Sequence, residues 1–189
     1  MTLLIIGLLL FLGPHSVPIL APAWREHMRQ RWGETRWKLG YSLLAGLGLA
    51  LIVMGYGQAR LSPQVLWATP RGVAHLAGLL MLPSLVLLAA AYVPGNALKA
   101  RLGHPMILAV KLWAAAHLLA NNTLADLLLF GSFLIWAVLD FRSARRRPAA
   151  PSPAGRAGPT ALAVLLGLLA CAALVMGGHQ ALMGVRPFS

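Results

Sequence analysis

Five of the six histidines lie inside apolar stretches of the sequence or at their edges, where polar side chains are rare. These are His15, His75, His104, His117 and His179. A neutral imidazole can bind a metal or haem iron through one ring nitrogen while a hydrogen bond holds the other. Because polar groups in a membrane span face the protein interior, these histidines are the first candidates for a functional site.

His15 and His117 are the pair that could share one ligand. His15 lies eight residues before Ala23, about 12 Å from the end of its apolar stretch. His117 lies twelve residues after Pro105, about 18 Å from the start of its own stretch and measured from the same side. Two histidines facing each other across an apolar pocket are the usual ligands of a b-type haem. An interhelical hydrogen bond for each histidine is the alternative, and it stays open.

Asn121 and Lys111 are candidate cofactor-binding residues beside this pair. Asn121 lies four residues after His117, on the same helix face, and could hold the second ring nitrogen. Lys111 lies seven residues after His104 and about 10 Å inside its apolar stretch. Its stem can carry the ammonium back to the membrane surface. The alternative is that its ammonium neutralises the negative charge of a carboxylate, such as a haem propionate or Asp140.

Other metal chemistries find no support in the sequence. There is no CxxCH, which excludes covalent attachment of a c-type haem, and no HExxH, the zinc-protease motif. The single cysteine, Cys171, lies in an apolar stretch and favours a packing role.

The stretches that carry these residues are long enough to cross a membrane. The chain has 189 residues, of which 59% are hydrophobic and 11% charged, against roughly 25% charged in a soluble domain. A span needs about 20 apolar residues, and in lipid it must be helical. The sequence predicts one all-α polytopic membrane helix bundle over 1–189. Its six expected spans are 3–23, 39–59, 72–93, 105–121, 124–141 and 161–185.

The net charge of +12 follows the connections between these spans. Twelve of the 16 lysines and arginines lie in the first, third and fifth connections, and three lie on the other side. The positive-inside rule therefore predicts that these connections are cytoplasmic and that both termini lie outside. The lipid bilayer is the partner that this charge pattern indicates, and nucleic acid is not expected. Residues 143–159, rich in proline, alanine and arginine, predict a disordered cytoplasmic linker.

Two local patterns predict structure rather than chemistry. The sequence TLAD resembles a capping box, with Thr123 as the N-cap residue and Asp126 at the third position of a helix. Gly46, Ala50 and Met54 are spaced by four and predict a face for close helix packing.

Several segments together resemble the NnrU family of small bacterial membrane proteins, which is linked to denitrification and nitric oxide metabolism. The segments are FLGPHSVPIL, REHMRQRWGE, HP followed by LWAAAHLLANN, and WAVLDFRSARRR. The related zeta-carotene cis–trans isomerase is a haem b protein whose histidines match His15 and His117. The resemblance implies haem b at this pair, a bacterial inner-membrane location, and a redox or denitrification partner in the membrane. One departure is Gly103, where the family commonly has arginine before His-Pro.

Three functions remain open from the sequence. The first is a haem b protein acting in nitrogen-oxide metabolism or in an isomerase-like redox role. The second is a membrane methyltransferase, because RLGHPM resembles a motif that binds S-adenosylmethionine through groups such as Arg101, His104 and Lys111. Its expected glutamate is missing, since the only glutamates are Glu26 and Glu34. The third is a non-enzymatic membrane assembly factor.

Overall fold

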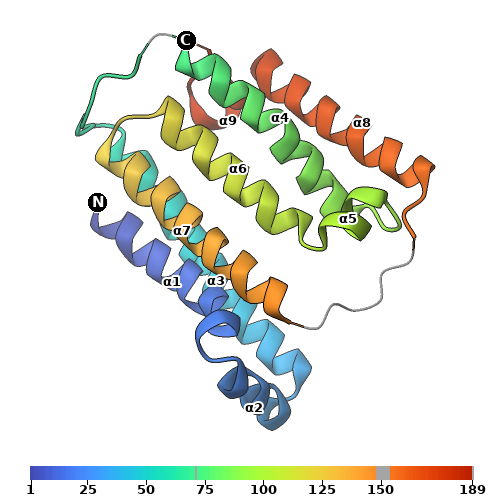
Figure 1. The fold of residues 1–189 in the computed structure, drawn as a ribbon. Helices are drawn as coiled ribbons and strands as arrows, with labels where there is room; N and C mark the ends of the chain where they lie inside the picture. Colours follow the sequence, from blue (N-terminus) through green and yellow to red (C-terminus); the bar gives the residue numbers. More distant parts are fainter. Residues whose placement is uncertain (71, 148–153, 189) are drawn as a thin grey trace.

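The computed structural model describes residues 1–70, 72–147 and 154–188, and it confirms the all-α membrane bundle (Figure 1). In the described residues all regular structure is helical apart from two isolated bridges. The helices are α1 (Thr2–Leu20), α2 (Pro22–Trp32), α3 (Glu34–Ala59), α4 (Val73–Tyr92), α5 (Ala97–Leu102), α6 (Pro105–Ala120), α7 (Leu124–Arg146), α8 (Ala157–Ala173), the π-helix η1 (Leu174–Gly178) and α9 (His179–Met183).

Five helical segments are long and apolar enough to cross a membrane, and α6 is a shorter apolar helix of 16 residues. Each of the six predicted spans corresponds to one of these. The sixth is not one straight helix, because a kink at Gly177, with φ of 138°, separates α8 from α9. The chain is a multi-pass membrane protein.

These six apolar segments form a row of packed neighbours. α8 packs on α4, α4 on α6, α6 on α7, α7 on α1, and α1 on α3 (Figure 1). Helix α7 therefore lies between α1 and α6, the two helices that carry His15 and His117. Any site shared by these histidines must be built around α7.

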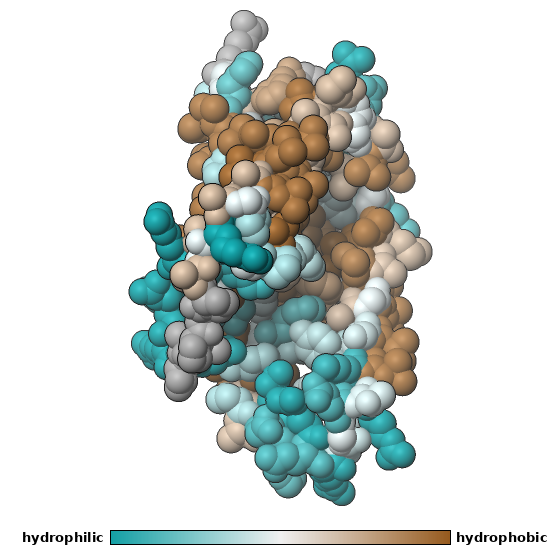
Figure 2. Space-filling view, turned by 90° about the vertical axis from the view of Figure 1, so that its right-hand side faces the viewer, coloured by the Kyte–Doolittle hydropathy of each residue, from teal (hydrophilic) through white to brown (hydrophobic). Residues whose placement is uncertain are grey.

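One end of the bundle carries most of the positive charge. We call it the basic end; it comprises α2, α5, the end of α7 and the starts of α3 and α6. The other end, where both chain termini lie, is here called the Thr123 end (Figure 1). Figure 2 views the molecule with the basic end below: hydrophilic residues gather there, around a hollow at the centre of the face.

The closest packing joins α1 to α3. A Cβ on Gly7 would lie 2.6 Å from the backbone nitrogen of Ile52, and one on Gly48 would lie 2.6 Å from that of Phe11. The two backbones therefore touch, which only glycine allows. The predicted small-residue face was wrong, because Gly46 on α3 faces open space. A spacing of four identifies a helix face but does not say which neighbour it meets.

Several local predictions can be compared with the helix ends. The capping box is confirmed: the Thr123 hydroxyl accepts from Asp126 N at 3.3 Å, and Thr123 N donates to the Asp126 carboxylate at 3.0 Å. The first span ends at Leu20 rather than Ala23, because Ala21 leaves the helical region and Pro22 begins α2. The predicted disordered linker at 143–159 is helical at both ends, because α7 continues to Arg146 and α8 begins at Ala157. Its part at 148–153 lies outside the described residues.

Candidate functional site

His15 lies in the second half of α1 within a cluster of aromatic rings. Its Nδ1 lies 2.6 Å from the carbonyl oxygen of Phe11, one turn earlier in the helix. Its ring stacks on Phe11 at 4.4 Å and meets Tyr41 of α3 at 5.1 Å and Trp136 of α7 at 5.9 Å. Because a carbonyl oxygen only accepts, Nδ1 carries the hydrogen and Nε2 of the neutral ring keeps its lone pair.

His117 repeats this arrangement in the last turn of α6. Its Nδ1 lies 2.8 Å from the carbonyl oxygen of Trp113, four residues earlier. Its ring stacks on Phe130 of α7 at 4.6 Å and lies 5.3 Å from the ring of Trp113. Throughout the described part of the chain, neither His15 nor His117 has a hydrogen-bond partner at Nε2. Each imidazole is therefore fixed in one tautomer, with its metal-binding nitrogen free.

The structure does not bring the two imidazoles into contact. His15 packs at the level of Trp136 on α7 and His117 at the level of Phe130, six residues or about 9 Å apart along the helix. The ring of Phe133 lies between these levels, 5.6 Å from Phe11 and 5.5 Å from Trp113. A continuous path of aromatic rings thus connects the two histidines.

Asn121 lies beside His117 but binds its backbone. Its Nδ2 donates to the His117 carbonyl oxygen at 2.8 Å. The role that we expected for Asn121, holding the second ring nitrogen, is taken by the carbonyl of Trp113. The reason is that Asn121 terminates α6 in an extended conformation, which turns its side chain back to cap the helix.

Lys111 points toward the basic end and meets an aromatic ring. Its Nζ lies 4.6 Å from the centre of the Phe141 ring on α7. Asp140, the acid considered as its partner, pairs instead with Arg147 at 3.6 Å. Lys111 therefore makes a cation–π contact in place of an ion pair.

Two features of α7 were not predicted from the sequence: the environment of Trp136, and a partner of Asp126 beyond its predicted capping role. The Nε1 of Trp136 is buried without a hydrogen-bond partner, next to His15. Asp126 is 5% exposed and accepts a hydrogen bond from the hydroxyl of Tyr56 at 2.6 Å. Trp136 lies four residues before Asp140, so its position on the inward-facing side of α7 was available from the spacing.

The remaining span-edge histidines are engaged elsewhere. His75 stacks on Phe188 at 5.4 Å, and His179 Nδ1 lies 2.7 Å from the Val185 carbonyl oxygen. His104 precedes α6 and meets the edge of Phe141 at 6.5 Å. Among the described residues, no group of three or more histidine, cysteine or acidic side chains could hold a metal ion.

The donor chemistry of His15 and His117 fits a haem iron. Both offer a neutral imidazole nitrogen in an apolar, aromatic environment, with the opposite nitrogen held by a carbonyl. The unpartnered Nε1–H of Trp136 adds a donor beside His15. For one iron to bind both rings, the side chain of Phe133 must leave the space between them.

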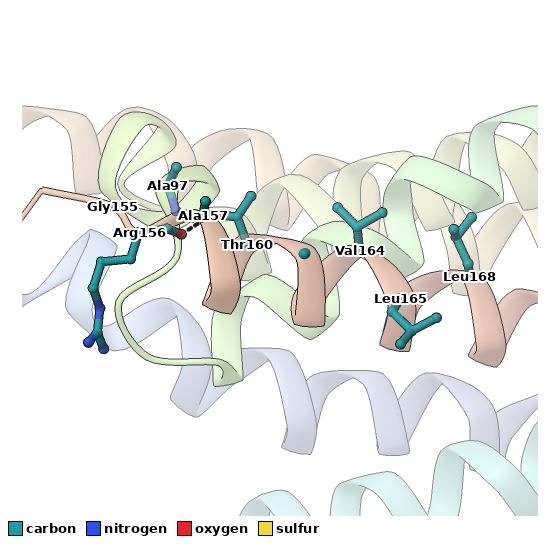
Figure 3. Close-up of a pocket in the computed structure, with 9 residues that line it drawn as sticks. Ala97, Gly155, Arg156, Ala157, Thr160, Val164, Leu165 and Leu168 are labelled. Carbon is teal, nitrogen blue, oxygen red and sulfur yellow. Dashed lines mark hydrogen bonds between the residues drawn. The ribbon is translucent and has the colours of Figure 1, made fainter.

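The cavity drawn in Figure 3 lies away from these histidines. It is an open surface pocket of about 620 Å³, lined by the first turns of α8, the two residues before them and the start of α5. Its walls are mostly apolar, with Val164, Leu165 and Leu168 along α8 and Arg156 at one end (Figure 3). At this end, the backbone N–H of Arg156 donates a hydrogen bond to the Gly95 carbonyl oxygen at 2.9 Å, which joins the start of α8 to the loop before α5.

A comparison with known families agrees with this architecture. The family described as NnrU protein matches residues 3–187, nearly the whole chain. Among curated proteins and among solved structures, none matches. The match spans every helix of the bundle and both candidate histidines, and the chain therefore belongs to the NnrU family.

Proposed function

We propose that this NnrU-family protein binds haem b within its helix bundle, where His15 and His117 would hold the iron. The observation that carries the proposal is the state of the two imidazoles. In each, Nδ1 is bonded to the carbonyl four residues earlier, and Nε2 has no partner in the described structure. Such a carbonyl fixes the ring orientation and raises the basicity of the opposite nitrogen, as it does for most metal-binding histidines.

The surrounding side chains have definable tasks in this proposal. Phe11, Phe130 and Trp113 pack against the two imidazoles and exclude water from them. A dry, apolar shell favours neutral ligands and sets the reduction potential of a bound iron. Bound haem would supply one-electron redox chemistry. The family's link to denitrification makes nitrogen-oxide metabolism in the bacterial inner membrane the proposed setting.

The first experiment is an optical spectrum of the purified protein, oxidised and then reduced with dithionite. We expect a Soret band that shifts on reduction, with sharp α and β bands. His15→Ala and His117→Ala should each abolish the low-spin spectrum, because each removes one axial ligand. His75→Ala is the matched control, since this histidine stacks on Phe188 outside the site. A featureless spectrum after haem supplementation would refute the proposal.

The space between the histidines gives a second test. Because the ring of Phe133 lies between their levels, Phe133→Ala should increase the fraction of protein that binds added haem. Phe133→Trp should decrease it. If neither variant changes haem binding while His15→Ala and His117→Ala abolish it, the Phe133 side chain does not occupy the space that haem would fill. Nitric oxide consumption by the reduced wild-type protein then tests the proposed metabolic setting.

A further inference from the structure

The ring of Phe141, near the basic end of α7, is surrounded by cationic and donor side chains. The ammonium of Lys111 lies 4.6 Å from the ring centre, and the guanidinium of Arg145 lies 5.9 Å from it. The ring of His104, just before α6, meets its edge at 6.5 Å. We call Lys111, Arg145 and His104, together with Phe141, the Phe141 cluster. It joins the starting end of α6 to the final turns of α7.

The chain offers few acidic side chains that could balance this cluster. The whole sequence contains four acidic residues against 16 lysines and arginines. Glu26 pairs with Arg29 at 3.0 Å, and Glu34 pairs with Lys38 at 2.7 Å.

The other two acidic residues are also engaged. Asp126 lies at the Thr123 end and is bonded to Tyr56 and Thr123. Asp140, the nearest, pairs with Arg147 and also interacts electrostatically with His104 of the cluster. Among the described residues, no carboxylate lies within ion-pair distance of Lys111 or Arg145, so these two cations are open to an anion from another molecule.

Because of its position, Lys111 needs an anionic partner more than an ordinary surface lysine does. Lys111 lies six residues after the start of α6, about 9 Å along an apolar helix. A charge at this depth costs free energy unless it is paired or reaches the headgroup region. Lys99, on α5 at the same end, differs: its Nζ donates to the Ala91 carbonyl oxygen at 2.9 Å.

We propose that the Phe141 cluster binds the phosphate group of an anionic phospholipid at the basic end of the bundle. Basic pockets between membrane helices are suited to such headgroups. Lys111 would contribute a point charge, and Arg145 a planar guanidinium that can bind two phosphate oxygens. The chemistry would also accept a haem propionate, which is a carboxylate, so the experiment must separate these two sources.

The test uses the full-length protein in nanodiscs of phosphatidylcholine doped with phosphatidylglycerol. Native mass spectrometry counts the phosphatidylglycerol molecules retained by each variant. Lys111→Gln should weaken retention by about tenfold, the effect expected for one charge-assisted contact. Lys111→Arg keeps the cation and should retain the lipid. Lys99→Gln is the matched control and should behave like wild type, because its ammonium already has a carbonyl partner.

Three results would overturn the proposal. Equal losses in Lys111→Gln and Lys99→Gln would mean that only the general positive charge of this end attracts lipid. Equal retention of phosphatidylcholine and phosphatidylglycerol would exclude a phosphate site that depends on net lipid charge. A Lys111→Gln protein that keeps its lipid but has an altered haem spectrum would assign the cluster to a propionate. The lipid measurement does not depend on haem binding, so the two proposals can fail separately.

Discussion

The polar groups at the two ends of α7 differ in whether they have hydrogen-bond or ion-pair partners within the chain. At the Thr123 end, the buried carboxylate of Asp126 accepts hydrogen bonds from Tyr56 and from both the backbone and the hydroxyl of Thr123. At the basic end, the ammonium of Lys111 lies over Phe141 without a carboxylate. Nearer the middle of α7, the Nε1–H of Trp136 has no hydrogen-bond acceptor among the described residues.

This difference separates structural from functional polar groups. A buried polar group that is fully satisfied within the chain contributes to stability and needs nothing further. A group left without a partner costs stability unless another molecule completes it. We therefore expect substitutions at the Thr123 end to change folding, and those at the basic end to change ligand binding.

The largest effect should come from Asp126→Ala. It removes the acceptor of three hydrogen bonds and leaves the hydroxyl of Tyr56 partly buried without its partner. We expect the free energy of unfolding to fall by about 3 kcal/mol, measured by denaturant titration in detergent. Asp140→Ala is the comparison, and its loss should stay below about 1 kcal/mol because its ion-pair partner Arg147 is half exposed and lies 3.6 Å away. Equal losses at both positions would remove the distinction between the two ends.

A smaller effect, of opposite sign, is expected for Lys111→Met. In pure phosphatidylcholine the substitution removes a charge that has no anion, so stability should rise by about 1 kcal/mol. In phosphatidylglycerol the gain should disappear, because there the wild-type lysine has a phosphate partner. Thermal unfolding in the two lipids provides the measurement. A loss of stability in both lipids would show that Lys111 is satisfied within the protein.

The smallest effect is expected for Trp136→Phe. Removing a buried donor that has no acceptor should leave stability unchanged or raise it by less than about 1 kcal/mol. Haem affinity should fall if the indole nitrogen binds the cofactor, which a titration of the apoprotein with haem would measure. A fall in stability without any change in haem affinity would indicate an internal partner for Nε1.

The features that could be predicted from the sequence depend on short segments. The capping box at Thr123 and Asp126 needs only a spacing of three residues, and each span needs only apolar length. The capping box was confirmed, and five of the six expected spans correspond to helical segments long and apolar enough to cross a membrane. The family resemblance was confirmed by a match over residues 3–187.

The features that could not be predicted depend on how helices lie against one another. The sequence placed His15 and His117 within about 6 Å of the same depth because the helix ends were assigned from composition. In the structure α1 ends at Leu20, and the two rings pack six residues apart on α7. The aromatic partner of Lys111 depends on the packing of α6 against α7. Haem binding by His15 and His117 stays a prediction.

The glycine contact between α1 and α3 has a consequence for how the protein is made. Gly7 and Gly48 bring these two backbones together using only the first part of the chain, up to Ala59. At about 5–20 residues per second, the ribosome needs several seconds or more to finish the rest. The first helical hairpin can therefore close in the membrane before α7 has been synthesised, and α7 later docks onto a finished surface. A bulky residue at Gly48 would act at this early step, during insertion.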